Sequence, residues 1–124
     1  MAFDYGDMRT GVAIAKDGET EPLTTITADD LWPEVTSLIL EHKPAQLVVG
    51  LPRNLNGDST AQTHKAQAFA SSLAQVTQLP VALQDEAMSS QRALERIGKN
   101  TPIAQRKKLL DQVAAQIILE DYFI

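Results

Sequence analysis

The sequence contains no cysteine, which excludes disulfide bonds and thiolate metal sites. It also lacks an apolar run near the roughly 20 residues that span a bilayer, and its first residues show neither the basic stretch nor the apolar core of a signal peptide. We therefore expect a cytoplasmic protein that makes no membrane contact. The chain has 124 residues, of which 44% are apolar, and this predicts a single domain over residues 1–124.

Positive charge is scarce over most of the chain. The formal net charge is −5, which argues against a general basic coat for unspecific nucleic-acid binding. Residues 91–108 are the exception, since six basic residues and one acid give this segment +5 against −10 for the remainder. The six are Arg92, Arg96, Lys99, Arg106, Lys107 and Lys108. Taken alone, such a run is typical of a solvated face flanking a helix, and a nucleic-acid contact is the alternative.

Hydrophobic patterning predicts an α/β fold. Short apolar or alternating runs that suit strands occur at residues 1–3, 11–15, 21–27, 46–51 and 79–83. Helical spacing of apolar residues occurs at 27–43, 59–76, 89–97 and 104–122. In the second of these helices we expect Ser59 at the N-cap and Val76 on the buried side. The order of elements predicts a mixed five-stranded sheet, with its first three strands antiparallel and helices on both faces.

Three acidic residues stand where strands or a helix would point carboxylates toward one place. Asp4 follows the first apolar run, Glu86 follows the last predicted strand, and Asp111 begins the apolar face of the last helix. Converging carboxylates hold hard divalent cations against a phosphate, so the pattern indicates phosphodiester chemistry. Spacing alone is equally consistent with Asp4 in a turn and Asp111 on a helix surface. Asp85 would point to the sheet face opposite Glu86, so only one of the two can serve the site.

Four motifs together resemble one family. They are Asp4-Tyr-Gly-x-x-Arg-x-Gly-Val-Ala, Val48-Val-Gly-Leu-Pro-x-x-x-x-Gly57, Asp85-Glu-x-Met-Ser-Ser and Lys107-Lys-x-x-Asp-x-x-Ala-Ala-x-x-Ile-Leu-x-x-Tyr122. In this order, over essentially the whole chain, they resemble the YqgF family. Its members are also called RuvX-type Holliday junction resolvases and are assigned as nucleases of pre-16S ribosomal RNA. The resemblance implies a ribonuclease-H-like fold and a metal-dependent endonuclease that cleaves precursor rRNA or branched DNA.

The resemblance also implies roles for particular residues. It makes Asp4, Glu86 and Asp111 the catalytic ligands of a two-metal site that takes Mg²⁺ or Mn²⁺. The expected nucleic-acid contacts are Arg9, Lys99, Arg106, Lys107 and Lys108. Arg9 can pair a phosphate through its planar fork, and the two neighbouring lysines lie one helical turn before Asp111. A surface charge without a partner is the alternative for each.

One position departs from the family pattern, which expects arginine after Glu86 where this chain has Ala87. The change removes a phosphate contact or a carboxylate partner. It leaves open a second interpretation, a nucleic-acid-binding or ribosome-assembly factor with weak catalysis. A third, an ATPase-like relative of the same fold, fits poorly with one domain that has no second lobe. We expect nucleic acid as the partner, and a monomer or weak homodimer.

Overall fold

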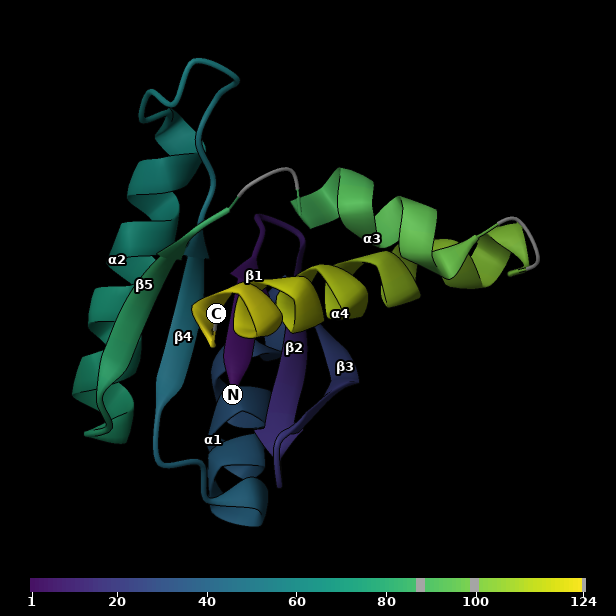
Figure 1. Ribbon diagram of the computed structural model, residues 1–124. Helices are drawn as coiled ribbons and strands as arrows, with labels where there is room; N and C mark the ends of the chain where they lie inside the picture. The colour runs from purple at the N-terminus through teal and green to yellow at the C-terminus, as the bar shows by residue number, and fades with distance from the viewer. Residues whose placement is uncertain (87–88, 99–100, 124) are drawn as a thin grey trace.

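The computed structural model describes residues 1–86, 89–98 and 101–123. Five strands and four α-helices follow one another in the predicted order (Figure 1). The strands are β1 (Ala2–Tyr5), β2 (Arg9–Lys16), β3 (Glu19–Thr27), β4 (Leu47–Leu51) and β5 (Val81–Asp85). The helices are α1 (Leu31–His42), preceded by a 3₁₀ turn at Ala28–Asp30, and α2 (Ala61–Thr77), α3 (Ser89–Ile97) and α4 (Ile103–Tyr122).

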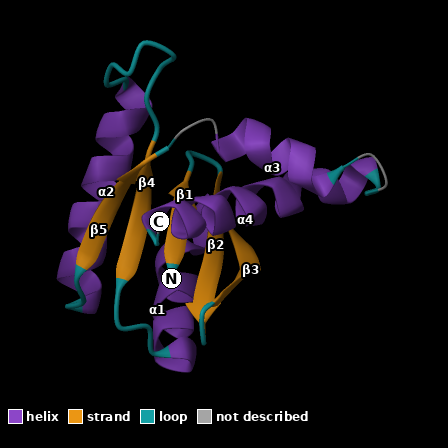
Figure 2. Cartoon of the chain, in the orientation of Figure 1, coloured by secondary structure: helices purple, strands orange, loops and turns teal. Residues whose placement is uncertain are grey.

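The sheet has the strand order β3-β2-β1-β4-β5. β1 is antiparallel to β2, and β2 to β3, whereas β4 runs parallel to both β1 and β5. This confirms the prediction of a mixed sheet with three antiparallel strands first. Helices α1 and α2 cover one face and α4 crosses the other (Figure 2). The carboxyl ends of the parallel strands β1, β4 and β5 therefore meet at one edge of the sheet.

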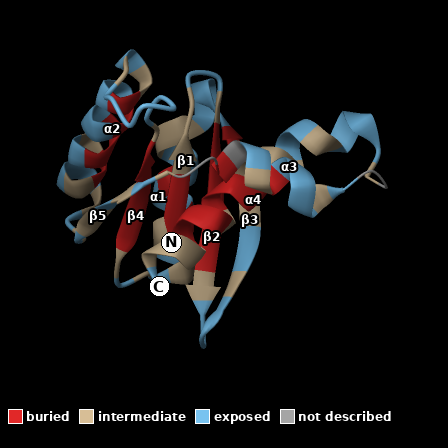
Figure 3. Ribbon diagram, turned by 45° about the horizontal axis from the view of Figure 1, so that its top comes forward, coloured by how far each residue is buried: buried red, intermediate tan, exposed pale blue. Residues whose placement is uncertain are grey.

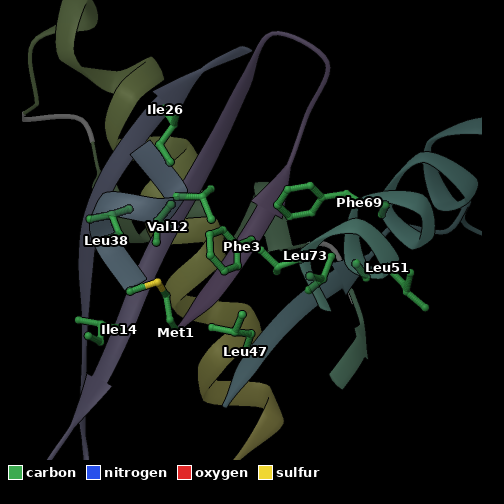
Figure 4. Close-up of a cluster of buried hydrophobic side chains, with 14 residues drawn as sticks. Met1, Phe3, Val12, Ile14, Ile26, Leu38, Leu47, Leu51, Phe69 and Leu73 are labelled. Atoms are coloured by element: carbon green, nitrogen blue, oxygen red, sulfur yellow. The ribbon is translucent and has the colours of Figure 1, made fainter. Parts of the chain in front are cut away.

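The main core lies between the sheet and helices α1 and α2 (Figure 4). Phe69 of α2 is its centre, with ring centroids 5.7 Å from Phe3, 4.6 Å from Tyr5 and 5.6 Å from Trp32. Phe3 and Tyr5 point into this core because alternate residues of a strand face one side. Asp4, between them, must face the α4 side.

A second core forms under α4. Ile118 and Leu119 pack on Ala2 and Val48, and all four are almost completely buried. Figure 3 shows buried residues along α4 and along the central strands of the sheet. The C-terminal half of α4 is therefore fixed on the centre of the sheet. The first turn of α4 extends past the strands together with α3 (Figure 1).

Helix α3 packs on α4 through Ala93, which is fully buried. Two arginines of α3 each form a pair of hydrogen bonds with an acid near the end of α4. Arg92 bonds both oxygens of Asp121, at 2.8 and 3.2 Å, and Arg96 bonds both oxygens of Glu120, at 3.0 and 2.9 Å. These two arginines of the basic segment therefore hold α3 against α4.

Two local predictions for α2 are wrong. The N-cap is Thr60, not Ser59, because Thr60 takes the extended conformation and exchanges hydrogen bonds with Thr63 in a capping box. Val76 is 57% exposed. The buried stripe of this helix is centred between Phe69 and Ala70, and Val76 falls at its margin. None of the helices in the described ranges is both long and apolar enough to cross a bilayer.

Candidate active site

The three predicted carboxylates come from three different elements of the fold. Asp4 lies in β1 on the face covered by α4, and it is paired in register with Gly11 of β2. Glu86 follows β5 directly, and its backbone N–H donates to the carbonyl of Leu51 at 3.0 Å. Asp111 lies in α4. All three reach the edge of the sheet where the parallel strands end.

Gly11 lets α4 approach the sheet closely enough for Asp111 to reach the cluster. A Cβ atom at Gly11 would collide with the Asp111 carbonyl and with the backbone of Gln112, so only glycine allows this approach. Because Gly11 faces Asp4 across β1 and β2, the same contact places Asp111 beside Asp4.

A second glycine makes room for Glu86. A Cβ atom at Gly50 of β4 would lie 2.9 Å from both Cγ and Oε1 of Glu86. The glutamate side chain therefore lies across the backbone of β4. Ile118 of α4 packs against the same glycine, so the carboxylate is enclosed between the sheet and the helix.

The environment raises the pKa of Asp4 well above its usual value. Burial is the largest cause, followed by the negative charge of Glu86, a hydrogen bond with Glu86 and the charge of Asp111. Burial also raises the pKa of Glu86, against the opposing effect of hydrogen bonds from Ser89 and Asp4. Ser89 Oγ donates to Glu86 Oε1 at 3.0 Å. Both carboxyl groups are therefore harder to ionise than an exposed acid, Asp4 most of all.

Arg9 supplies the nearby positive charge. Its Nε donates to Asp111 Oδ2 at 2.8 Å, and the two side chains are 37% and 19% exposed. Arg9 begins β2, at the same edge of the sheet as Asp4. Sequence reasoning assigned Arg9 to a phosphate and missed this partner, because a contact across 102 positions has no local signal.

The donor set has the chemistry that a hard divalent cation requires. All three side chains are carboxylates, and Mg²⁺ and Mn²⁺ prefer oxygen ligands. The pKa of Asp4 is raised first by burial and then by the charges of Glu86 and Asp111, and a bound cation would favour the ionised form of all three. Within the described ranges, no three acids or histidines close around a single point as a one-ion cage. Sites with two ions divide their carboxylates between the ions and need no such cage.

Asp85 is excluded from the cluster by its direction. Its carboxylate is exposed and accepts a hydrogen bond from Arg53 Nε at 3.1 Å, away from Glu86. The two neighbours therefore point to opposite faces, as the alternation of the strand predicted, and Glu86 is the one on the side of α4.

Three of the predicted nucleic-acid contacts lie in the first turns of α4, namely Arg106, Lys107 and Lys108. Lys107 and Lys108 are exposed there. Arg106 is half-buried, and its Nε donates to the carbonyl of Thr101 at 2.8 Å. Lys99 lies outside the described residues, and so does Ala87.

Ser89 is a contributor to the cluster that the sequence analysis did not name. Its buried hydroxyl donates to Glu86. The signal was its spacing, since a residue three positions after Glu86 at a helix start can reach back to that side chain.

Comparison with known proteins assigns the chain to a family. Residues 1–124 match the family model described as RuvX: Holliday junction resolvase. The chain belongs to the RuvX family. A RuvX relative from Methylobacillus flagellatus, named "Putative pre-16S rRNA nuclease", is 45% identical over 130 residues, covering 99% of this chain and 88% of the relative. A relative of the same name from Dechloromonas aromatica is 42% identical over 134 residues, with the same coverage.

Solved structures identify the fold of this RuvX chain. The RuvC of T. thermophilus in complex with a Holliday junction superimposes with a TM-score of 0.59 at 14% identity, covering 98% of this chain and 91% of RuvC. A further Thermus thermophilus RuvC structure gives 0.56, also at 14% identity, covering 98% and 92%. At this identity the likeness concerns the fold alone, and it confirms the predicted ribonuclease-H-like architecture.

Proposed function

We propose that this protein is a metal-dependent endonuclease that hydrolyses phosphodiester bonds in precursor 16S rRNA or in branched DNA. The observation that carries the proposal is the enclosed cluster of Asp4, Glu86 and Asp111 in a chain of the RuvX family. The relatives are named after pre-16S rRNA and the family after the Holliday junction. Both nucleic acids are therefore candidate substrates. Either substrate would place the protein in the cytoplasm, and we propose a monomer or weak homodimer.

Asp4, Glu86 and Asp111 would hold two Mg²⁺ or Mn²⁺ ions. When bound, such ions supply a nucleophilic hydroxide and stabilise the leaving oxygen. The protein itself would hold its carboxylates in position before the substrate binds. Gly11 and Gly50 set the backbone distances, and Ser89 holds Glu86 in one orientation. Fixed ligands need no rearrangement during the reaction, which is how electrostatic catalysis gains its advantage.

Arg9 would position the phosphate. Its Nε is committed to Asp111, and within the described part of the chain no hydrogen bond engages its two terminal nitrogens. Those nitrogens form the planar fork that matches two phosphate oxygens. Anchoring one edge of the guanidinium on a candidate cation ligand directs the other edge to a phosphate at the same cluster.

Lys107, Lys108, Arg106 and Lys99 would bind the sugar–phosphate backbone beside the cluster. Contacts of this kind fix the register of the nucleic acid and carry no sequence information. Their strength would fall as salt is raised, because each neutralised phosphate releases counterions.

The deciding experiment is cleavage of a labelled four-way DNA junction and a labelled precursor 16S rRNA fragment side by side. Each would be incubated with Mn²⁺, with Mg²⁺ and with chelator. Cleavage by the wild type that is lost in chelator and in Asp111→Asn supports the proposal. Equal cleavage by wild type and Asp111→Asn would remove the cluster from the chemistry.

A second candidate function is nucleic-acid binding with weak catalysis. It is favoured by Ala87, which stands where the family pattern has arginine. Tight binding of either probe without metal-dependent cleavage would select this alternative.

A further inference from the structure

Two apolar side chains project into solvent from connections at the end of the sheet where the candidate active site lies. Met8, in the turn between β1 and β2, is 76% exposed, and Leu55, in the segment between β4 and α2, is 93% exposed. Both connections leave the sheet at the edge where Asp4 and Glu86 lie (Figure 1). We call this pair of side chains the apolar rim.

The first turns of α2 hold both connections in place. Gln62 donates to the carbonyl of Tyr5 at 3.1 Å, and Lys65 pairs with both oxygens of Asp7, each at 3.1 Å, so the turn bearing Met8 is fixed. Thr63 Oγ1 donates to the carbonyl of Pro52, at the start of the segment bearing Leu55. The N-terminal end of α2 therefore holds both connections that carry the rim residues.

The segment bearing Leu55 has its own internal bonds. Asn54 Oδ1 accepts from the backbone N–H of Asn56 at 3.0 Å and of Asp58 at 2.8 Å. The backbone N–H of Asn54 donates to the Asp58 carbonyl at 3.1 Å, and Arg53 bonds Ser59 Oγ at 3.0 Å. This network closes the segment around its polar residues and leaves Leu55 pointing out of it. The exposure of Leu55 is thus imposed by the turn.

Both connections that carry the rim are bonded to elements that carry the carboxylates. Met8 precedes Arg9, which bonds Asp111 of α4. Arg53, two positions before Leu55, bonds Asp85 at the end of β5, although the Asp85 carboxylate itself points away from the cluster. A phosphate held at the cluster would bring the adjoining nucleosides to this edge of the sheet.

We propose that the apolar rim contacts unstacked bases of the nucleic-acid substrate next to the cleaved phosphate. The inference rests on the proposed function and adds how the substrate is selected. Apolar side chains inserted between base steps hold a distorted nucleic acid, whereas a regular stacked duplex offers them no site. The rim would therefore favour branch points, loops and single-stranded ends over duplex. Uncharged side chains release no counterions, so this contribution does not vary with salt.

The test uses three single variants of the full chain, Met8→Ser, Leu55→Ser and Leu40→Ser. Leu40, in α1, is the control, because it is 71% exposed and makes no part of the rim. The probes are a four-way DNA junction with 2-aminopurine at the branch, a single-stranded precursor 16S rRNA fragment and a linear duplex. Binding is measured with Ca²⁺ in place of Mg²⁺ at two salt concentrations.

We expect Leu55→Ser and Met8→Ser each to weaken binding of the junction or the single strand about tenfold, with duplex binding and the salt slope unchanged. The fluorescence increase of 2-aminopurine on binding should shrink in both, and Leu40→Ser should match the wild type. Wild-type affinity in both rim variants would overturn the inference while leaving the nuclease proposal intact. Loss of a wild-type dimer in sedimentation, without loss of nucleic-acid affinity, would make the rim a contact between copies and overturn it too. Failure of the wild type to bind any probe would instead refute the proposed function, and the inference with it.

Discussion

The guanidinium of Arg9 bonds the carboxylate of Asp111 through Nε, 2.8 Å from Oδ2, although the two residues are 102 positions apart. The bond joins the first residue of β2 to the middle of α4 at the edge of the sheet where the acidic cluster lies. It gives Arg9 a fixed orientation, and it gives Asp111 a partial counter-charge that Asp4 and Glu86 do not share.

The first prediction concerns Arg9→Gln. Loss of one phosphate contact should weaken nucleic-acid binding about tenfold or more at low salt and reduce the salt slope by about one contact. Mn²⁺ binding, followed by calorimetry without substrate, should persist, because the three carboxylates remain. Lys16→Gln is the matched control, since Lys16 is exposed at the opposite end of the same strand. Loss of Mn²⁺ binding in Arg9→Gln would show that Arg9 instead maintains the cation ligands.

The second prediction concerns Asp4 and pH. The folded-state pKa of Asp4 is raised above its unfolded value, so the unfolded chain releases this proton more readily. The folded state gains stability from binding this proton more tightly. That gain is complete below the unfolded pKa of about 4 and is lost as pH rises through the folded pKa. Asp4→Asn should therefore stabilise the protein at pH 7 by about 0.5–2 kcal/mol and by less at pH 4.

Urea unfolding of wild type and Asp4→Asn at pH 4, 5.5 and 7 measures this difference. The same substitution should abolish metal-dependent cleavage, so stability and activity should move in opposite directions. Asp58→Asn, an exposed acid, serves as the control for removing a negative charge. An Asp4→Asn protein less stable than wild type at pH 7 would contradict the assignment of a crowded, buried carboxylate.

Sequence patterning predicted most of the fold because its signals are local. The continuous apolar run of β4 and the apolar run of β2 can be recognised from neighbouring residues alone. Val76 was misplaced because a shift of one position along α2 decides whether a residue lies in the buried stripe or at its margin. The pairing of Arg9 with Asp111 was missed for a different reason, since it depends on how closely α4 approaches the sheet. That approach is set by Gly11, whose role becomes visible only when the partner backbone is known.

The third prediction concerns the attachment of α3. Arg96 lowers the pKa of Glu120 below its usual value, chiefly through their hydrogen bonds. An acid with a depressed folded-state pKa adds stability above its unfolded pKa, and this is lost as pH falls through the folded value. Arg96→Gln should lower the melting temperature at pH 7 and have a smaller effect near pH 3.5. Glu95→Gln, an exposed change on the same helix, should leave both temperatures unchanged.

The last prediction concerns Gly11→Ala. A Cβ atom there would meet the backbone of Asp111 and Gln112, which cannot rotate away as a side chain could. Helix α4 must then shift outward, which costs about 1–3 kcal/mol or more for an overpacked interior and moves Asp111 off Asp4. We expect loss of cleavage together with a lower melting temperature.

Gly18→Ala separates this effect from glycine's backbone freedom. Gly18 has φ +84° and open space around its Cβ position, so alanine there is strained by its backbone alone, at a cost of about 1 kcal/mol. Gly18→Ala should keep full cleavage per folded molecule, whereas Gly11→Ala should lose it even below its melting temperature. Equal cleavage by the two folded variants would mean that the close approach of α4 at Gly11 does not set the position of Asp111.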